Sequence, residues 1–184
     1  ATKLFGFDKL LPMNTGAEGV ETSIKLSRKW GYLKKKVDEN LAKIVVCNNN
    51  FHGRTTTVIS FSTDPGSKDF FGPHTPGFIH IPYGEISALE NEFKKDKNIV
   101  AFLVEPIQGE AGVNVPEPEY LKKVRKHSSL FLGTCSESFQ NGAFFVGEHD
   151  RIFTSSLSSN KHYKKVVSYL SKKIPKIDDN FQQI

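Results

Sequence analysis

Three short segments of this sequence combine residue types that could bind an anion, a planar ring and a carboxylate. Thr15-Gly16-Ala17 opens a helix-like stretch, residues 50–54 join an aromatic ring to a guanidinium, and residues 105–112 hold two carboxylates and an amide. A helix N-terminus offers N–H groups to a phosphate, and glycine lets the backbone approach closely. Phenylalanine can stack on a planar molecule, and arginine can hold a carboxylate with two parallel hydrogen bonds. These segments are therefore candidates for a ligand site.

Each segment also has a plain structural explanation, and the residues alone leave both explanations open. Residues 15–17 could be an ordinary capped helix start, which their spacing favours. Residues 50–54 could be a turn with a solvated arginine, and residues 105–112 could be a polar connection between a strand and a helix. His52 is expected to be a loop histidine and not a catalytic base. No metal site is predicted, because His74 and His80 are also poor candidates for metal ligands.

The elements that must position these segments alternate between helices and strands. A helix with a 3.6-residue apolar period is predicted after the Thr15 cap, from about residue 16 to residue 33. Strands are predicted at residues 44–46, 79–81 and 100–104, and further helices at residues 86–93 and 119–126. This alternation predicts an α/β fold with a mainly parallel sheet flanked by helices. In such sheets ligands gather at the carboxyl ends of strands and at helix N-termini, where all three segments lie.

Composition argues against several other classes of protein. The chain has 184 residues and a formal net charge of +5, but its lysines and arginines are spread along the sequence without an arginine-rich arm. We therefore expect no nucleic-acid partner. No apolar run reaches the length of a membrane span, so no membrane partner is expected. Cys47 and Cys135 lie far apart and are expected to be ordinary thiols.

Four motifs occur in a fixed order along the first two-thirds of the chain. They are MNTGAE at residues 13–18, RKWGY at 28–32, NFHGR at 50–54 and VEPIQGEAGV at 104–113. This ordered set resembles the class III, fold-type I aminotransferases, which depend on pyridoxal 5′-phosphate (PLP), and its wording is closest to the ornithine aminotransferase branch. The resemblance covers about residues 1–126 and implies part of the large, PLP-binding domain of that family.

The resemblance implies a cofactor-binding role for four residues. Gly16 and Ala17 would bind the PLP phosphate through their backbone N–H groups. Phe51 would stack on the pyridine ring, and Glu105 would belong to the polar network behind the cofactor.

It also implies how substrates are bound and what they are. Arg54 would hold the substrate α-carboxylate, and Glu110 would be a gating carboxylate that pairs with a distant arginine. The implied reaction moves the δ-amino group of L-ornithine to 2-oxoglutarate, giving glutamate semialdehyde and glutamate. The family is homodimeric or higher, and its members work in the mitochondrial matrix or the cytoplasm.

The sequence departs from the family pattern after Arg125. The family continues into a strand ending in Ala-Asp-Glu and then Gln-Thr-Gly, and that Asp pairs with the pyridinium nitrogen. Here residues 130–139 read LFLGTCSESF, with no Asp in the required place, and no lysine of the tail stands in a Gly-Lys-Ala-Leu context. Neither the pyridinium Asp nor the Schiff-base lysine is identifiable, so we expect the isolated chain to be inactive. The alternative to an enzyme is a truncated or mis-spliced remnant that associates with a full-length subunit.

Residues 127–184 are therefore predicted to form a divergent tail. Residues 154–159 are expected to be a linker, and a basic helix is expected on the apolar positions Val166, Val167, Leu170 and Ile174. The strand at residues 100–104 is expected to lack at least one neighbour. An uncovered parallel edge is an aggregation hazard, so a poorly soluble or oligomeric product is expected.

Overall fold

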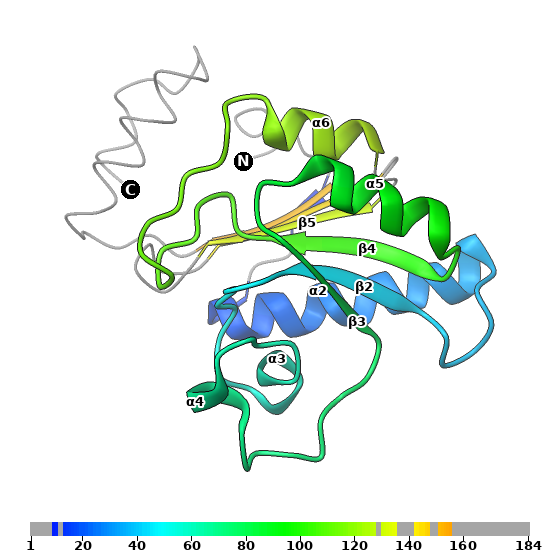
Figure 1. The fold of residues 1–184 in the computed structure, drawn as a ribbon. Helices are drawn as coiled ribbons and strands as arrows, with labels where there is room; N and C mark the ends of the chain where they lie inside the picture. Colours follow the sequence, from blue (N-terminus) through cyan, green and yellow to red (C-terminus); the bar gives the residue numbers. More distant parts are fainter. Residues whose placement is uncertain (1–8, 11–12, 128–129, 136–141, 148–150, 156–184) are drawn as a thin grey trace.

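One mixed sheet organises the chain in the computed structural model, which describes residues 9–10, 13–127, 130–135, 142–147 and 151–155. Its strand order is β1-β7-β6-β5-β4-β2-β3 (Figure 1). The strands are β1 (Lys9–Leu10), β2 (Lys43–Cys47), β3 (Phe78–Ile81), β4 (Ile99–Val104), β5 (Leu130–Cys135), β6 (Gly142–Gly147) and β7 (Arg151–Ser155). Strand β6 is antiparallel to both of its neighbours, and the other pairings among the described strands are parallel. The predicted α/β class with a mainly parallel sheet is confirmed.

Helices cover both faces of this sheet. The described helices are α2 (Gly16–Trp30), which continues into the π-helix η1 (Gly31–Lys35), α3 (Thr56–Ile59), α4 (Pro65–Lys68), α5 (Ile86–Lys95) and α6 (Tyr120–His127). In Figure 1, α2 (blue) lies on one face, and α5 and α6 (green to yellow-green) lie on the other. The three helices predicted from apolar periodicity are therefore confirmed, with small shifts at their ends.

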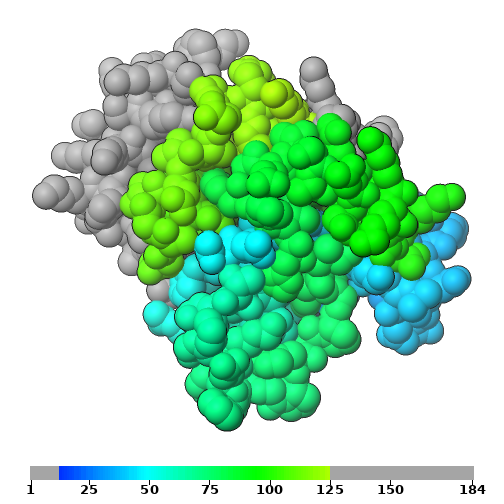
Figure 2. Space-filling model, viewed as in Figure 1, coloured from blue at the N-terminus to red at the C-terminus, as the bar shows by residue number. Residues whose placement is uncertain are grey.

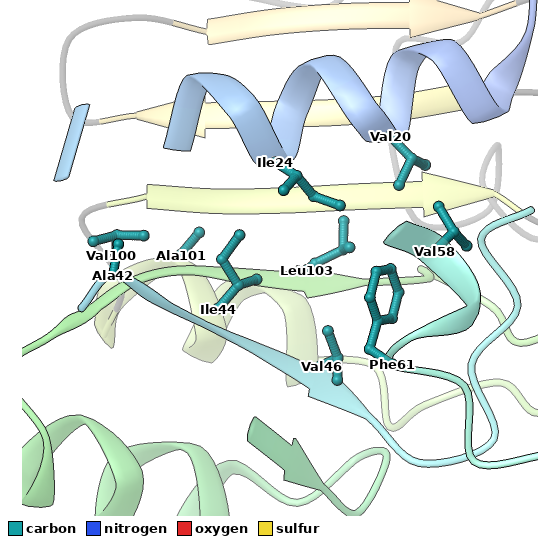
Figure 3. Packing of buried hydrophobic residues seen from close by; sticks show 10 residues of the cluster. All are labelled: Val20, Ile24, Ala42, Ile44, Val46, Val58, Phe61, Val100, Ala101 and Leu103. Atoms are coloured by element: carbon teal, nitrogen blue, oxygen red, sulfur yellow. The ribbon is translucent and has the colours of Figure 1, made fainter. Parts of the chain in front are cut away.

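Strands β2 and β4 are buried because the sheet has a hydrophobic core on each face. Ile44 and Val46 belong to the cluster that holds Val20 and Ile24 of α2 (Figure 3). The intervening Val45 belongs to the opposite cluster, which also contains residues of α5 and α6. Because successive side chains of a strand point to opposite faces, a continuous apolar run is what a strand between two cores needs.

The docking of α2 on the sheet depends on one close approach. The pairing of β2 with β4 shifts between Lys43 and Ile44, so that Lys43 pairs with Ile99 and Ile44 with Ala101. The skipped residue, Val100, lies against Gly31, where an added Cβ would overlap its Cγ1. A glycine at the start of η1 therefore lets the end of α2 lie directly on β4.

Two expectations about the second half of the chain need correction. Strand β4 does not lack a neighbour, because β2 pairs with it on one side and β5 on the other. The expectation was wrong because residues 130–135 form a strand although they carry no family motif. Residues 154 and 155 lie in β7, so the expected linker cannot begin there. Residues 156–159 and the expected basic helix lie outside the described residues.

Candidate ligand site at the carboxyl ends of the strands

The first part of the site is the N-terminus of α2. The Thr15 hydroxyl oxygen accepts a hydrogen bond from the backbone N–H of Glu18 at 3.2 Å, so the predicted N-cap is confirmed. The Glu18 carboxylate reaches back to the backbone N–H of Asn14 at 2.9 Å, one residue before the cap. The N–H groups of a first helical turn have no intrahelical acceptor, so those of Gly16 and Ala17 are suited to bind an anion.

The second part of the site is the loop that follows β2, which lies next to the first turn of α2. Gly53 has a φ of +121°, a backbone conformation that residues with a side chain rarely adopt. A Cβ added at Gly53 would lie 3.2 Å from the Cβ of Ala17. A side chain at position 53 would therefore be strained by this backbone angle and would crowd Ala17, so glycine favours the close approach of the loop to the helix N-terminus.

The same loop brings an aromatic ring and a guanidinium together. The Cζ atom of Arg54 lies 5.7 Å from the centroid of the Phe51 ring, within the range of a cation–π interaction. Phe51 is partly buried, whereas Arg54 is exposed. The loop thus carries a flat ring and a forked hydrogen-bond donor next to each other, close to the α2 N-terminus.

The third part of the site is Glu105, which directly follows β4 and is 1% exposed. Its Oε2 accepts a hydrogen bond from the backbone N–H of Phe51 at 3.2 Å. Its Oε1 is buried and has no hydrogen-bond partner among the described residues. Burial raises the pKa of this carboxyl to about 8, the Phe51 N–H opposes that shift, and the charge of Glu110 adds to it. Glu105 is therefore largely protonated at neutral pH and can offer a hydrogen bond as well as accept one.

Hydrogen bonds join the segment after β4 to the residues that follow β2 and β3. The side-chain amide of Gln108 donates to the carbonyl oxygen of Asn48, just after β2, at 2.8 Å. The Tyr83 hydroxyl, just after β3, donates to the carbonyl oxygens of Glu105 at 3.2 Å and Pro106 at 3.0 Å. Figure 2 shows the surfaces of the segments after β2 (cyan) and after β4 (yellow-green) side by side. Glu110 is exposed on the second of these segments.

The structure thus brings together most of the residues singled out in the sequence. Phe51 contacts both Arg54 and Glu105, and the charge of Glu110 acts on Glu105. Gly53 of the same loop lies close to Ala17, which adjoins Gly16. The sequence interpretation missed Tyr83. Its one signal was its position two residues after a predicted strand, at the edge where ligands gather.

Other kinds of site find no support in the part of the chain that the structure describes. No group of three or more histidine, cysteine, aspartate or glutamate side chains could hold a metal ion there. No described helix is long and apolar enough to cross a membrane.

Comparison with known sequences identifies the family. A model of the class III aminotransferases matches residues 1–130. The mitochondrial ornithine aminotransferase of Drosophila melanogaster is 63% identical over 125 residues, covering 68% of this chain and 29% of that protein. The ornithine aminotransferase of Plasmodium falciparum is 55% identical over 135 residues, covering 71% of this chain and 32% of that protein. The chain therefore spans about a third of the length of these relatives.

Solved structures agree with the sequence relatives. The ornithine aminotransferase of Toxoplasma gondii matches with a TM-score of 0.68 and 38% identity, covering 79% of this chain and 42% of that one. The ornithine δ-aminotransferase of Plasmodium falciparum matches with a TM-score of 0.55 and 47% identity, covering 72% of this chain and 29% of that one. Another structure of the Toxoplasma enzyme has PLP at partial occupancy in its active site. The family match and the sequence and structural relatives together show that the chain belongs to the PLP-dependent class III aminotransferases.

Proposed function

We propose that this site binds PLP and forms the cofactor- and carboxylate-binding part of an ornithine aminotransferase. The observation that carries the proposal is the junction of the α2 N-terminus, the loop from Phe51 to Arg54 and Glu105 at the carboxyl ends of the strands. In the proposed reaction the δ-amino group of L-ornithine passes to 2-oxoglutarate, which gives glutamate semialdehyde and glutamate. The substrates follow the names of the relatives from Drosophila and Plasmodium.

The described residues fit PLP in three respects. The N–H groups at Gly16 and Ala17 suit a phosphate, and Gly53 keeps the neighbouring loop close to them. Phe51 offers a face for the ring. The buried Oε1 of Glu105, which no other described residue satisfies, is the kind of polar atom that a ligand completes. When bound, PLP supplies the electron sink that stabilises negative charge beside the transferred amino group.

The protein residues then have separate tasks. Arg54 holds a substrate carboxylate with its planar fork, next to the ring that Phe51 stacks on. Glu105 keeps a proton on a buried carboxyl and, through the Phe51 N–H, fixes the stacking residue. Glu110 competes with substrate carboxylates for a cationic group and so acts on substrate choice.

We further propose a homodimeric or larger assembly and a location in the mitochondrial matrix or the cytoplasm. The mitochondrial relatives from Drosophila melanogaster and Rattus norvegicus support the first of these compartments.

A chimera tests whether this site supports the reaction. Residues 1–126 would replace the matching segment of the Drosophila enzyme, which supplies the rest of the active site. Glutamate formation would be followed with L-ornithine as donor and 2-oxoglutarate as acceptor. The proposal predicts a kcat/KM within about tenfold of the parent enzyme, a difference of about 1.4 kcal/mol. A soluble, PLP-loaded chimera that forms no glutamate from ornithine would contradict it.

A second experiment separates an active enzyme from a remnant that associates with a full-length subunit. No lysine of the sequence stands in a Gly-Lys-Ala-Leu context, so we propose that the chain alone binds PLP at most weakly and without a covalent bond. The chain would be incubated with PLP, treated with borohydride and mapped by mass spectrometry. A single stoichiometrically labelled lysine would show that another lysine anchors PLP and would contradict the non-covalent binding proposed here.

A further inference from the structure

The loop that follows β2 is fixed to the protein core by two residues that the proposed reaction does not use. Asn50 and His52 are 7% and 5% exposed, whereas Phe51 between them is partly exposed and Arg54 is exposed. The side-chain amide of Asn50 donates to the carbonyl oxygens of Cys47 at 2.6 Å and of Phe61 at 2.9 Å. The loop therefore alternates between buried anchors and the side chains that meet the ligand.

Both buried residues contact Phe61, Asn50 through a hydrogen bond and His52 through its ring. Phe61 is fully buried in the cluster that also holds Val46 and Val20. Its ring lies 5.6 Å from the His52 ring, at 55°, and 4.4 Å from the Phe78 ring. Phe61 cannot shift without disturbing a close-packed core, so whatever packs on it is held in place.

His52 lies between the two points at which the loop meets the rest of the site. On one side, the backbone N–H of Phe51 donates to Glu105. On the other side, Gly53 lies against Ala17 of α2. A movement of the His52 backbone would disturb both contacts, because its two peptide bonds are shared with these neighbours.

We propose that His52 is a positioning residue: its buried imidazole packs on the Phe61 ring and so fixes the backbone that carries Phe51 and Arg54. The ligand that these two residues meet rests on the proposed function, whereas the packing does not. Burial lowers the pKa of the imidazole to about 3, so the ring is uncharged at neutral pH. The proposed role of His52 therefore rests on its packing against the Phe61 ring and needs no charge on the imidazole.

The first test measures local opening of the loop in the complete chain. Amide hydrogen exchange would be followed by NMR at Phe51 and, as a reference for global unfolding, at Leu103 in β4. His52→Ala should raise the ratio of the Phe51 rate to the Leu103 rate at least about tenfold, and His52→Phe should restore it. Leu89→Ala is the matched control, because it makes a cavity in the core on the opposite face. It should speed exchange at Leu103 by lowering the global stability, and it should not raise the ratio.

The second test measures the effect on the ligand. Pyridoxine 5′-phosphate has the phosphate and ring of PLP but no aldehyde, so it reports non-covalent binding. His52→Ala should weaken its binding at least about tenfold, whereas His52→Phe and Leu89→Ala should stay within about threefold of the wild-type chain.

The outcomes separate the two proposals. An unchanged exchange ratio in His52→Ala, or a His52→Phe variant that does not restore it, would overturn the positioning role. If the wild-type chain does not bind pyridoxine 5′-phosphate, the proposed function fails and the exchange ratio alone decides the role of His52. If His52→Ala does not fold, Phe61→Leu removes the same ring contact from the other side and must raise the ratio in the same way.

Discussion

The backbone N–H of Phe51 donates a hydrogen bond to the buried Oε2 of Glu105 at 3.2 Å, although the two residues are 54 positions apart in the sequence. This contact joins the loop after β2 to the end of β4. The residue proposed to stack on the cofactor is therefore held by the carboxyl group proposed to lie behind it. A substitution of Glu105 should consequently change both the stability of the protein and the position of the Phe51 backbone.

Glu105→Gln should remove a pH-dependent part of the stability. Burial raises the pKa of Glu105 from 4.5 to about 8, so the folded state binds this proton more tightly than the unfolded state does. The corresponding stability is complete below the unfolded pKa and is lost as the pH rises through the folded pKa. Urea unfolding of the wild-type chain between about pH 5 and pH 8 should show a decline of up to about 1.4 kcal/mol per pH unit from this group. If Glu105→Gln declines with the same slope, Glu105 is not the group that titrates.

Gly53→Ala should destabilise the chain more than the same change at Gly84. Both glycines have positive φ angles, of +121° and +84°, but only at Gly53 would the new Cβ meet another residue, Ala17. Backbone strain should cost about 1–3 kcal/mol at either site, and the contact should add to it at Gly53. Urea unfolding of both variants measures the difference. When Gly53→Ala is combined with Ala17→Gly, it should lower the free energy of unfolding by less than it does in the wild-type chain. If Gly53→Ala lowers the free energy of unfolding equally with and without Ala17→Gly, the contact does not matter.

Gly31→Ala should overpack the junction between α2 and β4. The added methyl group would overlap the side chain of Val100, and overpacking of a core costs about 1–3 kcal/mol. Val100→Ala alone should also destabilise, because it leaves a cavity. The double variant should be more stable than the sum of the single losses predicts, since each change relieves the other. Strict additivity in a double-mutant cycle would contradict this docking.

Arg54→Lys should impair the chimeric enzyme without releasing its cofactor. A lysine lacks the planar fork that grips a carboxylate with two hydrogen bonds. Its loss should cost about 2–4 kcal/mol in transition-state binding, or roughly 30- to 1000-fold in kcat/KM. PLP content should stay unchanged, because Gly16, Ala17 and Phe51 are untouched. Wild-type rates with both ornithine and 2-oxoglutarate would show that Arg54 is only a turn residue.

Local features of this protein could be predicted from the sequence, and long-range ones could not. The helix start at Thr15 is set by residues within a few positions of it, and β4 is recognisable as a continuous apolar run. The second neighbour of β4 could not be foreseen, because strand pairing joins segments that carry no shared motif. The hydrogen bonds of Tyr83 depend on the place of β3 in the strand order, which no local pattern encodes. The unsatisfied Oε1 and the raised pKa of Glu105 follow from burial that the whole fold creates.

The most direct test of the proposed site is a titration of the 184-residue chain with pyridoxine 5′-phosphate, which cannot react with lysines. Isothermal titration calorimetry would compare the wild-type chain with Gly53→Ala and Gly84→Ala, and pyridoxine without the phosphate would serve as the ligand control. The proposed site predicts saturable binding that depends on the phosphate, that Gly53→Ala weakens at least about tenfold, and that Gly84→Ala leaves unchanged. No saturable binding by the wild-type chain, or equal binding by Gly53→Ala, would contradict a cofactor site between α2 and the loop after β2.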